Sequence, residues 1–401
     1  MRILVINSRI YSVEYELLEF PHEKIIARGR IDKIGDEGAI IDHIIEDREE
    51  EKIVRPVHSH EEAIGVIVEI LTHPLFGVIK SKKEIDAVGH RVVHGGEDFH
   101  SSCLITKDVI EGIKRNIELA PLHNPFNLKA INASMKIFPN IPHVAVFDTS
   151  FYQRMPERAF YYALPLHLYK LYRIRRYGFH GIAHRYCLET VCKEMQVSSK
   201  RLKIISIYLG EGSSITAIKH GFPIDTSMGF TPLSGLVMTT RCGNIDPEII
   251  IYLCKLGYKI VDVETLLHQE SGILGVSGVS DNMKEVIEEA KKGDKRCKLA
   301  IELFVYSVRK YIFSYYGILE GVDVIVLTGG IGVNSPYIRE RIFQNMGFIG
   351  LRIDKRKNEK VTGRIGRIDG GRSKVKVFIV PRNEGVLIGR EVFRVVKGRK
   401  G

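Results

Sequence analysis

The sequence predicts an α/β protein made of two similar halves with a cleft between them. The stretch Lys203–Ile218 reads as two strands rich in β-branched residues, joined by the glycine-bearing turn Leu209–Ser213. The chain opens in the same way, with a strand from Arg2, an asparagine at the bend (Asn7) and a second strand up to Leu17. One hairpin in each half suggests duplication, although two unrelated hairpins would give the same pattern. Glycines in such a turn let backbone N–H groups approach an anion.

Length and composition are those of an ordinary globular protein with room for two domains. The chain has 401 residues, 44% of them hydrophobic and 27% charged. A formal net charge of +11 favours anionic ligands but does not specify nucleic acid. A strand begins at Arg2 and no apolar run is long enough to cross a bilayer, so we expect neither a secretory signal nor a membrane partner.

The cysteines and the densest basic segment argue against two other classes of site. The six cysteines are scattered and form no Cys-x-x-Cys pair, which disfavours structural zinc and fits a reducing cytoplasm. The segment Lys170–Tyr177 mixes cations with aromatic residues, as an RNA-binding surface does. A solvated surface beside an anion-binding cleft is the favoured interpretation, so we expect no nucleic-acid partner.

The first half continues with alternating helices and strands. Ser59 and Glu62 have capping-box spacing at the start of a helix over about 60–72. The segment Ile85–Gly96 is an apolar strand that carries Arg91 and runs into a glycine pair. Thr106 can cap a helix over about 107–119, a further helix covers about 126–136, and a strand covers His143–Phe147. Asp148 follows that strand, where an acid is well placed to face a cleft or, alternatively, to cap the core.

The second half begins near Thr149 and carries its polar residues on turns. His180 lies in the glycine-flanked turn Tyr177–Gly181, ahead of the central hairpin. The segments Thr226–Leu233 and Thr240–Pro247 are loop-like, and Asp246-Pro247 can open a helix that ends at Gly257. Further helices are expected over 281–292 and 295–316.

A strand, a glycine-rich loop and a helix start together form a candidate nucleotide site. Strand Val322–Leu327 leads into the loop Thr328–Ser335, and Ser335-Pro336 opens a helix. This signal is weak on its own. A last strand, Val375–Val380, leads to Arg382–Glu384 and a closing helix.

Several segments together resemble the motifs of the acetate kinase family. They occur in the family's order over essentially the whole chain, and the ordered set is far more specific than any member. The segments are Val88–Gly96, Leu119–Pro125, Ala145–Thr149, Tyr177–Gly181, Met228–Leu233, Thr240–Gly243 and Gly330–Gly332. The resemblance implies duplicated α/β domains of the actin/hexokinase/Hsp70-like (ribonuclease H-like) fold with ATP bound in the interdomain cleft, and a homodimer. It also implies that the closing helix returns to the first domain, giving domains of residues 1–149 plus 385–401 and residues 150–384.

The same resemblance implies reversible phosphoryl transfer between ATP and acetate, giving ADP and acetyl phosphate. Arg91 and Arg241 would bind the substrate and the transferring group, His180 would donate to an equatorial oxygen, and Asp148 would complete the catalytic set. The residue types suit this chemistry, because phosphoryl transfer needs positioning and charge neutralisation, and acetate is already an anion. Both arginines could instead form structural ion pairs.

The remaining implied sites are an acyl pocket, a nucleotide site and a metal site. Acetate would contact Arg91, Val93, Leu122, His123, Phe179 and Pro232. The nucleotide would contact Gly210, Glu211, Gly212, Asn282, Met283, Lys284, Gly330, Ile331, Gly332 and Asn334. Mg²⁺ or Mn²⁺ would be held by Asn7, Asp148 and Glu384, directly or through water. The apolar residues match the acetate-using pattern, so we expect propionate to be a poorer substrate, not an excluded one.

The chain departs from the family pattern at the turns expected to hold phosphate. In the first turn, Asn7–Glu14, Glu14 stands where the family has lysine, and in the central turn Glu211 stands where it has asparagine. Val333 and the segment Asn282–Lys284 also differ. A carboxylate beside a triphosphate costs up to about 4 kcal/mol at close range and an effective dielectric of 20. We therefore expect weak ATP use, a strong need for divalent metal, a roughly tenfold gain on Glu211→Asn and a further gain on Glu14→Lys, unless Arg9 occupies that space.

Three functional hypotheses follow from these residues. The favoured one is a divergent but working acetate kinase. The second is a non-catalytic or weakly active paralogue that binds a small carboxylate. The third is a short-chain acyl kinase that uses another phosphoryl donor.

Overall fold

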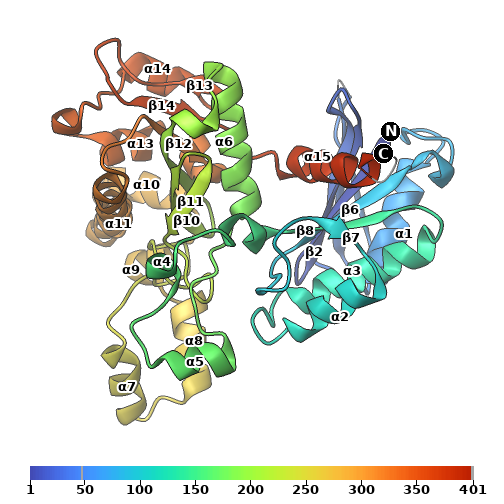
Figure 1. Cartoon of the computed structure of the whole chain (residues 1–401), viewed down its shortest axis with the longest axis horizontal. Helices are drawn as coiled ribbons and strands as arrows, with labels where there is room; N and C mark the ends of the chain where they lie inside the picture. The colour runs from blue at the N-terminus through green and yellow to red at the C-terminus, as the bar shows by residue number, and fades with distance from the viewer. Residues whose placement is uncertain (47, 399–401) are drawn as a thin grey trace. The chain divides into compact units, whose positions relative to one another are not determined.

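The computed structural model describes residues 1–46 and 48–398, and the chain forms two compact units (Figure 1). Unit 1 comprises Met1–Gln153 and Asn383–Gly401, and unit 2 comprises Arg154–Arg382. The chain thus leaves unit 1 at Gln153 and returns to it at Asn383, whereas we expected these crossings near 149 and 384. Among the described residues, no helix combines the length and the apolar character needed to span a membrane.

Unit 1 is built on an eight-stranded mixed sheet in the order β5-β4-β3-β2-β1-β6-β8-β7. Its strands are β1 (Arg2–Ser8), β2 (Ser12–Glu19), β3 (Lys24–Asp32), β4 (Ala39–Ile45), β5 (Glu51–Arg55), β6 (Ala87–Val92), β7 (Cys103–Leu104) and β8 (His143–Phe147). β1, β6 and β8 are parallel, and β1 to β5 form antiparallel pairs. The carboxyl ends of the three parallel strands therefore meet at one edge of the sheet.

Helices cover both faces of this sheet, and the period-2 alternation of the strands decides which residues each face buries. Leu4, Ile6 and Val88 share a core with α1 (His60–Leu71) and α3 (Asn124–Ile137). A smaller apolar cluster adds α2 (Lys107–Arg115) to α3. The alternate residues, including Gly89, lie under α15 (Glu384–Lys397), and a Cβ on Gly89 would come within 2.6 Å of Val392.

Unit 2 is built on a six-stranded sheet in the order β11-β10-β9-β12-β14-β13. Its strands are β9 (Lys203–Leu209), β10 (Ser213–Lys219), β11 (Phe222–Thr226), β12 (Val324–Thr328), β13 (Gly366–Arg367) and β14 (Lys376–Ile379). The described helices are α4 (Glu157–Phe160), α5 (Leu166–Tyr172), α6 (Gly181–Met195), α7 (Glu248–Lys255), α8 (Ile260–Gln269), α9 (Gly272–Ser277), α10 (Met283–Lys292), α11 (Lys295–Leu319), α12 (Gly329–Asn334), α13 (Pro336–Phe343) and α14 (Lys355–Lys360). The long helix α11 supplies much of the core beneath the sheet.

The two sheets share one pattern, and this confirms the predicted duplication. In unit 1 the order β3-β2-β1-β6-β8 is an antiparallel meander extended by two parallel strands. In unit 2 the order β11-β10-β9-β12-β14 repeats it with the same strand directions. The two hairpins recognised in the sequence, β1-β2 and β9-β10, occupy equivalent places.

Some local expectations were wrong. The segment Thr328–Ser335 is not a loop, because Gly329–Asn334 forms helix α12 directly after β12. Gly329 has a φ of 79°, and a Cβ there would lie 2.3 Å from the carbonyl oxygen of Leu209, so the glycine serves close packing. The helix after Thr106 ends at Arg115 instead of 119.

Candidate active site

Three of the predicted site residues of unit 1 lie at the carboxyl edge of its parallel strands. Asn7 is the penultimate residue of β1, Arg91 is the penultimate residue of β6, and Asp148 directly follows β8. Side chains at this edge of an open α/β sheet are placed to meet a ligand. Asn7 and Arg91 also belong to the face that α15 covers, because they alternate with Ile6 and His90 along the strands.

Arg91 is the centre of this group. Its Nη2 donates to Oδ2 of Asp148 at 2.7 Å, and its Nη1 donates to Oδ1 of Asn7 at 3.1 Å. Its Nε lies 3.9 Å from Oε2 of Glu384, the first residue of α15. The side chains of Arg91 and Asp148 are 11% and 2% exposed. The structure therefore brings together four of the polar residues that the sequence assigned to substrate and metal, whereas His123 lies at the start of α3.

The oxygen atoms of this group suit a hard divalent cation. Asp148 and Glu384 supply carboxylates and Asn7 supplies an amide oxygen, which are the ligands that Mg²⁺ takes. Within residues 1–46 and 48–398, no three His, Cys, Asp or Glu side chains are gathered as a ready-made metal site. That arrangement fits Mg²⁺, which commonly binds through one or two carboxylates and keeps waters and substrate oxygens as its other ligands.

The predicted apolar contacts in unit 1 differ in exposure. Val93 is 5% exposed, and its N–H donates to Oδ1 of Asn127 at 3.0 Å. Leu122 is 53% exposed on the turn before α3, and His123 precedes the first residue of that helix. Val93 is thus held rigidly by its neighbours, whereas Leu122 presents an apolar side chain to solvent.

In unit 2, His180 is fixed at the N-terminus of α6. It adopts a left-handed conformation with φ of 57°, because the turn between Phe179 and Gly181 must reverse there. Its ring stacks on Tyr208 with centroids 4.2 Å apart, and its Nδ1 lies 2.9 Å from Oγ of Ser214. We expected a plain turn at His180, whereas the structure makes it the residue that caps a helix.

Arg241 and His180 converge on the central glycine turn. A Cβ on Gly212 would lie 3.2 Å from Cε1 of His180 and 3.3 Å from Nη1 of Arg241. Nη1 of Arg241 also donates to the carbonyl of Pro232 at 3.2 Å. Burial lowers the pKa of Arg241, and the charge of Glu211 acts in the opposite direction. The Arg241 guanidinium and the His180 imidazole therefore border Gly212, a residue of the turn that has no side chain, which is an arrangement suited to phosphoryl oxygens.

The predicted nucleotide residues fall into three groups, of which the first, Gly210–Gly212, is the central turn between β9 and β10. Gly330, Ile331, Gly332 and Asn334 all belong to α12. Since Gly329 packs against Leu209, this helix starts beside the turn of the central hairpin. Asn282 caps α10 by accepting from the N–H of Lys284 at 3.0 Å, while Met283 is 5% exposed and belongs to the core.

The negative charges of Glu14 and Glu211, the altered residues of the two turns, lie closer to positive charges than the sequence suggested. Oε1 of Glu14 lies 3.4 Å from Nη2 of Arg9 and 3.5 Å from Nη1 of Arg30. Glu211 is exposed and acts electrostatically on Arg241. Arg9 therefore occupies the space beside Glu14, which was the stated exception to the expected gain on Glu14→Lys.

Sequence reasoning missed Ser214 and Arg30 as neighbours of the site. Ser214 and Tyr208 face each other across β9 and β10, and Arg30 faces Glu14 across β2 and β3. Counting residues outward from each hairpin turn could have found the first pair. The second pair required β3, which was not predicted.

Two of the four cations in the basic segment Lys170–Tyr177 make contacts within the fold, whereas Lys170 and Arg173 are exposed. Arg175 stacks over the ring of Phe160 at 3.7 Å. Arg176 donates to the carbonyls of Thr226, Ser227 and Met228. These contacts give the two arginines a structural role.

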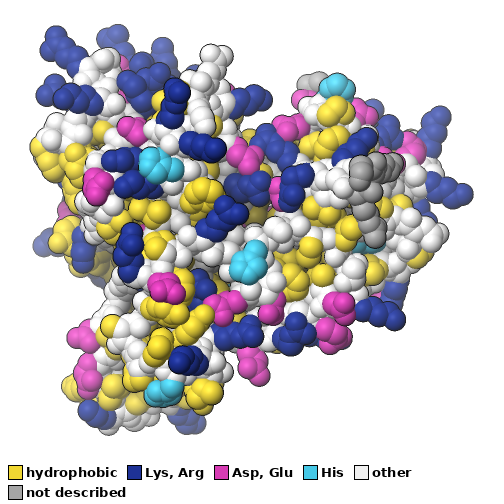
Figure 2. All heavy atoms as spheres, viewed as in Figure 1, with side chains coloured by type: hydrophobic (Ala, Val, Ile, Leu, Met, Phe, Trp, Pro, Cys, Tyr) yellow, Lys and Arg dark blue, Asp and Glu magenta, His cyan; other side chains and the backbone are white. Residues whose placement is uncertain are grey.

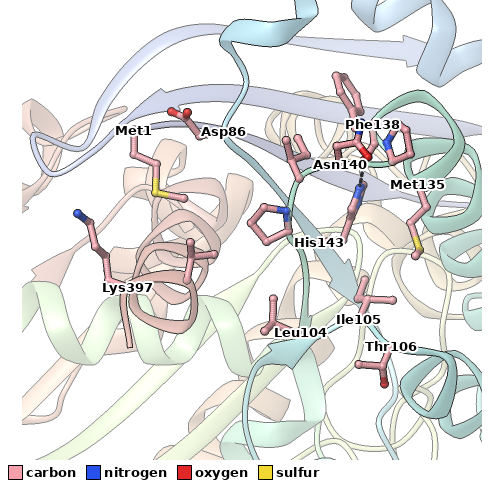
Figure 3. Close-up of a pocket in the computed structure, with 14 residues that line it drawn as sticks. Met1, Asp86, Leu104, Ile105, Thr106, Met135, Phe138, Asn140, His143 and Lys397 are labelled. Atoms are coloured by element: carbon pink, nitrogen blue, oxygen red, sulfur yellow. Dashed lines mark hydrogen bonds between the residues drawn. The ribbon is translucent and has the colours of Figure 1, made fainter. Parts of the chain in front are cut away.

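A large pocket lies at the opposite edge of the unit 1 sheet, where the parallel strands begin (Figure 3). It has a volume of about 900 Å³ and is lined by Met1, Asp86, Leu104, Ile105, Thr106, Met135, Phe138, Pro139, Asn140, Ile141, Pro142, His143, Val396 and Lys397. Two of its polar side chains bond within the protein: His143 contacts the Phe138 carbonyl through Nε2 at 3.0 Å, and Thr106 caps α2. The lining contains none of the described site residues.

Comparison with known proteins supplies the context for this geometry. The model of the Acetokinase family matches residues 2–390. The chain is 46% identical to an acetate kinase of Acetivibrio thermocellus over 398 residues, covering 99% of this chain and 100% of the relative. It is 45% identical to an acetate kinase of Thermotoga maritima over 400 residues, with 99% of both chains covered.

Solved structures of acetate and propionate kinases are also similar to this chain over nearly its full length. The acetate kinase of Porphyromonas gingivalis superposes with a TM-score of 0.94 at 39% identity, covering 98% of this chain and 99% of that one. A propionate kinase from Francisella tularensis superposes with a TM-score of 0.90 at 37% identity and the same coverage. These neighbours and the repeated sheet pattern together establish the predicted duplicated fold.

Proposed function

The chain belongs to the acetokinase family, and we propose that it transfers a phosphoryl group reversibly between ATP and acetate by direct in-line displacement. The products are ADP and acetyl phosphate. In the forward direction, a carboxylate oxygen of acetate bonds to the γ-phosphorus while the bond to the bridging oxygen of ADP breaks. No proton has to be removed from the acceptor, because acetate is ionised at neutral pH.

The observation that carries this proposal is the convergence of His180 and Arg241 on Gly212. In-line transfer spreads negative charge over three equatorial oxygens, and preorganised donors, here a guanidinium and an imidazole N–H, stabilise that charge more than they stabilise the ground state. In unit 1, Arg91 supplies the fork for the acetate carboxylate. In the same unit, Val93 and Leu122 would contact the methyl group.

Hydrogen bonding around Ser214 sets the donor state of His180. Ser214 Oγ lies 2.9 Å from Nδ1 of His180 and 2.8 Å from Nε2 of His184, whose Nδ1 lies 2.8 Å from Oγ of Ser206. If each hydroxyl donates to one imidazole nitrogen, His184 donates to Ser214, and Ser214 donates to His180. His180 then carries its proton on Nε2, the nitrogen that borders Gly212 and can donate to a phosphoryl oxygen.

A divalent cation fits the group of Asn7, Asp148 and Glu384. When bound, Mg²⁺ or Mn²⁺ would neutralise charge on the phosphate oxygens. Asp148 also orients Arg91 through their 2.7 Å hydrogen bond.

A non-catalytic paralogue is not favoured, because identity near 45% to acetate kinases extends over nearly the full chain. The proposal is tested by trapping acetyl phosphate with hydroxylamine, with ATP and other phosphoryl donors compared under Mg²⁺, Mn²⁺ and EDTA. We expect ATP-dependent hydroxamate that EDTA abolishes. Equal or better product with a different donor and none with ATP would support the acyl kinase hypothesis that uses another donor.

We also propose a homodimer that assembles through the surface of α5, α7 and α8. None of the α5 or α7 side chains is buried, although α7 reads Glu-Ile-Ile-Ile-Tyr-Leu-Cys-Lys. The exposed apolar side chains here are Leu166, Leu171, Tyr172, Ile249, Ile251, Tyr252, Leu256, Tyr258, Ile260 and Val261. Figure 2 shows hydrophobic side chains at the surface in the region where Figure 1 labels α5, α7 and α8. An apolar patch of this kind marks an interaction surface.

The oligomeric state can be measured by sedimentation velocity. We expect a dimer of 45.5 kDa chains that dissociates on Ile251→Asp combined with Leu256→Asp. Leu75→Asp, at an 84% exposed leucine of unit 1, is the matched control and should leave the dimer intact. A monomeric parent protein would refute the proposed homodimer.

We also propose a cytoplasmic location, which is supported by six free thiols. Cell fractionation can check this location.

A further inference from the structure

A row of polar side chains crosses the unit 1 sheet and ends at Arg91. Antiparallel register places Glu14 on β2 directly opposite Asn7 on β1 and directly opposite Arg30 on β3. β1 and β6 are parallel, with Ile6 beside His90, so the next residues, Asn7 and Arg91, are also neighbours. Directly paired residues project from the same face of a sheet. These four side chains therefore form one continuous line.

The contacts along this row are hydrogen bonds and ion pairs of definite direction. Nδ2 of Asn7 donates to Oε2 of Glu14 at 2.8 Å, and Oδ1 of Asn7 accepts from Nη1 of Arg91 at 3.1 Å. The other carboxylate oxygen of Glu14 lies between the guanidinium groups of Arg9 and Arg30, at 3.4 and 3.5 Å. Asn7 is 7% exposed and the Glu14 side chain 21%, so solvent has limited access to replace these partners.

The chemistry of the two neighbours permits only one orientation of the Asn7 amide. An ionised carboxylate only accepts hydrogen bonds, and a guanidinium only donates them. Asn7 must therefore turn its NH₂ to Glu14, which leaves its carbonyl oxygen for Arg91. With a lysine at position 14, both neighbours would be donors, and the NH₂ group would have to face one of them.

We propose that Glu14 is a positioning residue for the phosphotransferase reaction: it orients the Asn7 amide, which in turn orients Arg91 for the acetate carboxylate. This inference rests on the proposed function, since it takes Arg91 as the acetate-binding group. It reverses the expectation drawn from the sequence, in which Glu14 weakened the site and Glu14→Lys improved it. A lysine here would also stand among Arg9, Arg30 and Arg91.

The test compares substitutions at position 14 that differ in hydrogen-bond capacity, in the full-length protein. Glu14→Gln keeps an acceptor, whereas Glu14→Leu and Glu14→Lys remove it. We expect Glu14→Gln to stay within about threefold of the parent in kcat/KM for acetate, and the other two to raise KM for acetate by about tenfold or more, the usual range for a lost bond to a charged group. KM for ATP should change by less than about twofold. Glu19→Lys, on the same strand, is the matched control and should change neither constant.

A double variant keeps the test informative if Glu14→Lys folds poorly. Combining Asn7→Asp with Glu14→Lys places a carboxylate between two donors, so it should recover thermal stability and lower KM for acetate relative to Glu14→Lys alone. Folded Glu14→Leu and Glu14→Lys proteins with the parent KM for acetate would overturn the inference. So would a Glu14→Gln protein as impaired as Glu14→Leu.

Arg91→Ala separates this inference from the proposed function. If Arg91→Ala keeps full activity, the assignment of acetate to Arg91 fails. If it loses activity while the position 14 variants do not, only the role of Glu14 fails.

Discussion

At the scale of single residues, the site depends on cations that are held in place by the fold. Arg91 is fixed by Asp148 and Asn7 in unit 1, and Arg241 is fixed by the Pro232 carbonyl in unit 2. Desolvation lowers the pKa of Arg241, yet a guanidinium remains protonated across the physiological range. Both arginines can therefore offer a permanent charge to an anionic substrate.

Removing either arginine should cost activity without unfolding the protein. We expect Arg91→Ala and Arg241→Ala to lower kcat/KM by about a hundredfold or more, because each removes a charged donor from a developing anion. Arg28→Ala, at an exposed position of β3, is the control and should match the parent. Steady-state kinetics with a circular dichroism check would measure this, and full activity in either folded variant would refute the assignment.

Val93 should set acid preference. It is nearly fully buried, so Val93→Ala opens space for about one methylene and should shift the kcat/KM ratio of acetate to propionate by roughly tenfold towards propionate. Competition of the two acids in one assay measures this ratio directly. An unchanged ratio would place Val93 outside the acyl pocket.

Glu211 should weaken ATP use less than its position in the sequence suggested. It is exposed and lies within electrostatic reach of Arg241, so solvent and that cation screen its charge. We expect Glu211→Asn to raise kcat/KM for ATP by about threefold at low salt and less at high salt. Loss of activity instead would indicate that Glu211 contributes to binding the metal or to holding the turn.

At the scale of elements, close packing of α15 on β6 supports the end of the strand that carries Arg91. Gly89 lies two residues before Arg91, and its Cα faces Ile388 and Val392 of the helix. The same helix starts with Glu384, which lies 3.9 Å from Arg91. A change in the packing of α15 would therefore alter the surroundings of Arg91.

Gly89→Ala should destabilise the protein. Its Cβ would lie 2.6 Å from Val392 Cγ2 and 2.9 Å from Ile388 Cγ2, an overpacking that typically costs about 1–3 kcal/mol. Gly65→Ala is a matched control inside α1, where a Cβ meets nothing within 4 Å, and it should stabilise by up to about 1 kcal/mol through helix propensity. Urea unfolding distinguishes the two, and equal effects would contradict this packing argument.

At the scale of the whole molecule, unit 1 contains several histidines that are kept neutral by burial. Desolvation lowers the pKa of His43, His60 and His143, and it lowers that of His90 well below the usual value. His90 contacts His143 through Nε2 and Nδ1 at 3.1 Å. Protonating either ring would place an unfavourable charge in this core.

Stability should therefore fall on mild acidification. Because these groups bind protons more weakly in the folded than in the unfolded state, their contribution is complete above about pH 6.5 and is lost as the pH falls below that value. His90, whose pKa is lowered most, should contribute a slope that grows towards the one-proton limit as the pH falls below about 6.5. Urea midpoints between pH 7.5 and 5.5 test this, since carboxylates titrate lower. A flat profile would contradict it.

How much the sequence predicted depends on whether a feature is local. The hairpins at Asn7 and Gly212 were recognisable because strand alternation and turn glycines are signals within a few residues. Helix α12 could not be recognised in this way. The glycine at its start, Gly329, is needed because it packs closely against Leu209, which is distant in the sequence. The pairing of Glu14 with Arg30 was also missed, since it depends on the register of a strand that was not predicted.

The return of the chain to unit 1 at Asn383 has a consequence for synthesis on the ribosome. Residues Arg154–Arg382 are continuous and can form a complete unit as soon as they emerge. The sheet of unit 1 emerges before unit 2, yet the helix that covers Val5 and Gly89 is translated after unit 2. One apolar face of the nascent sheet therefore stays uncovered while all of unit 2 is synthesised. Unit 1 starts folding before unit 2 but can finish only after unit 2 has been made.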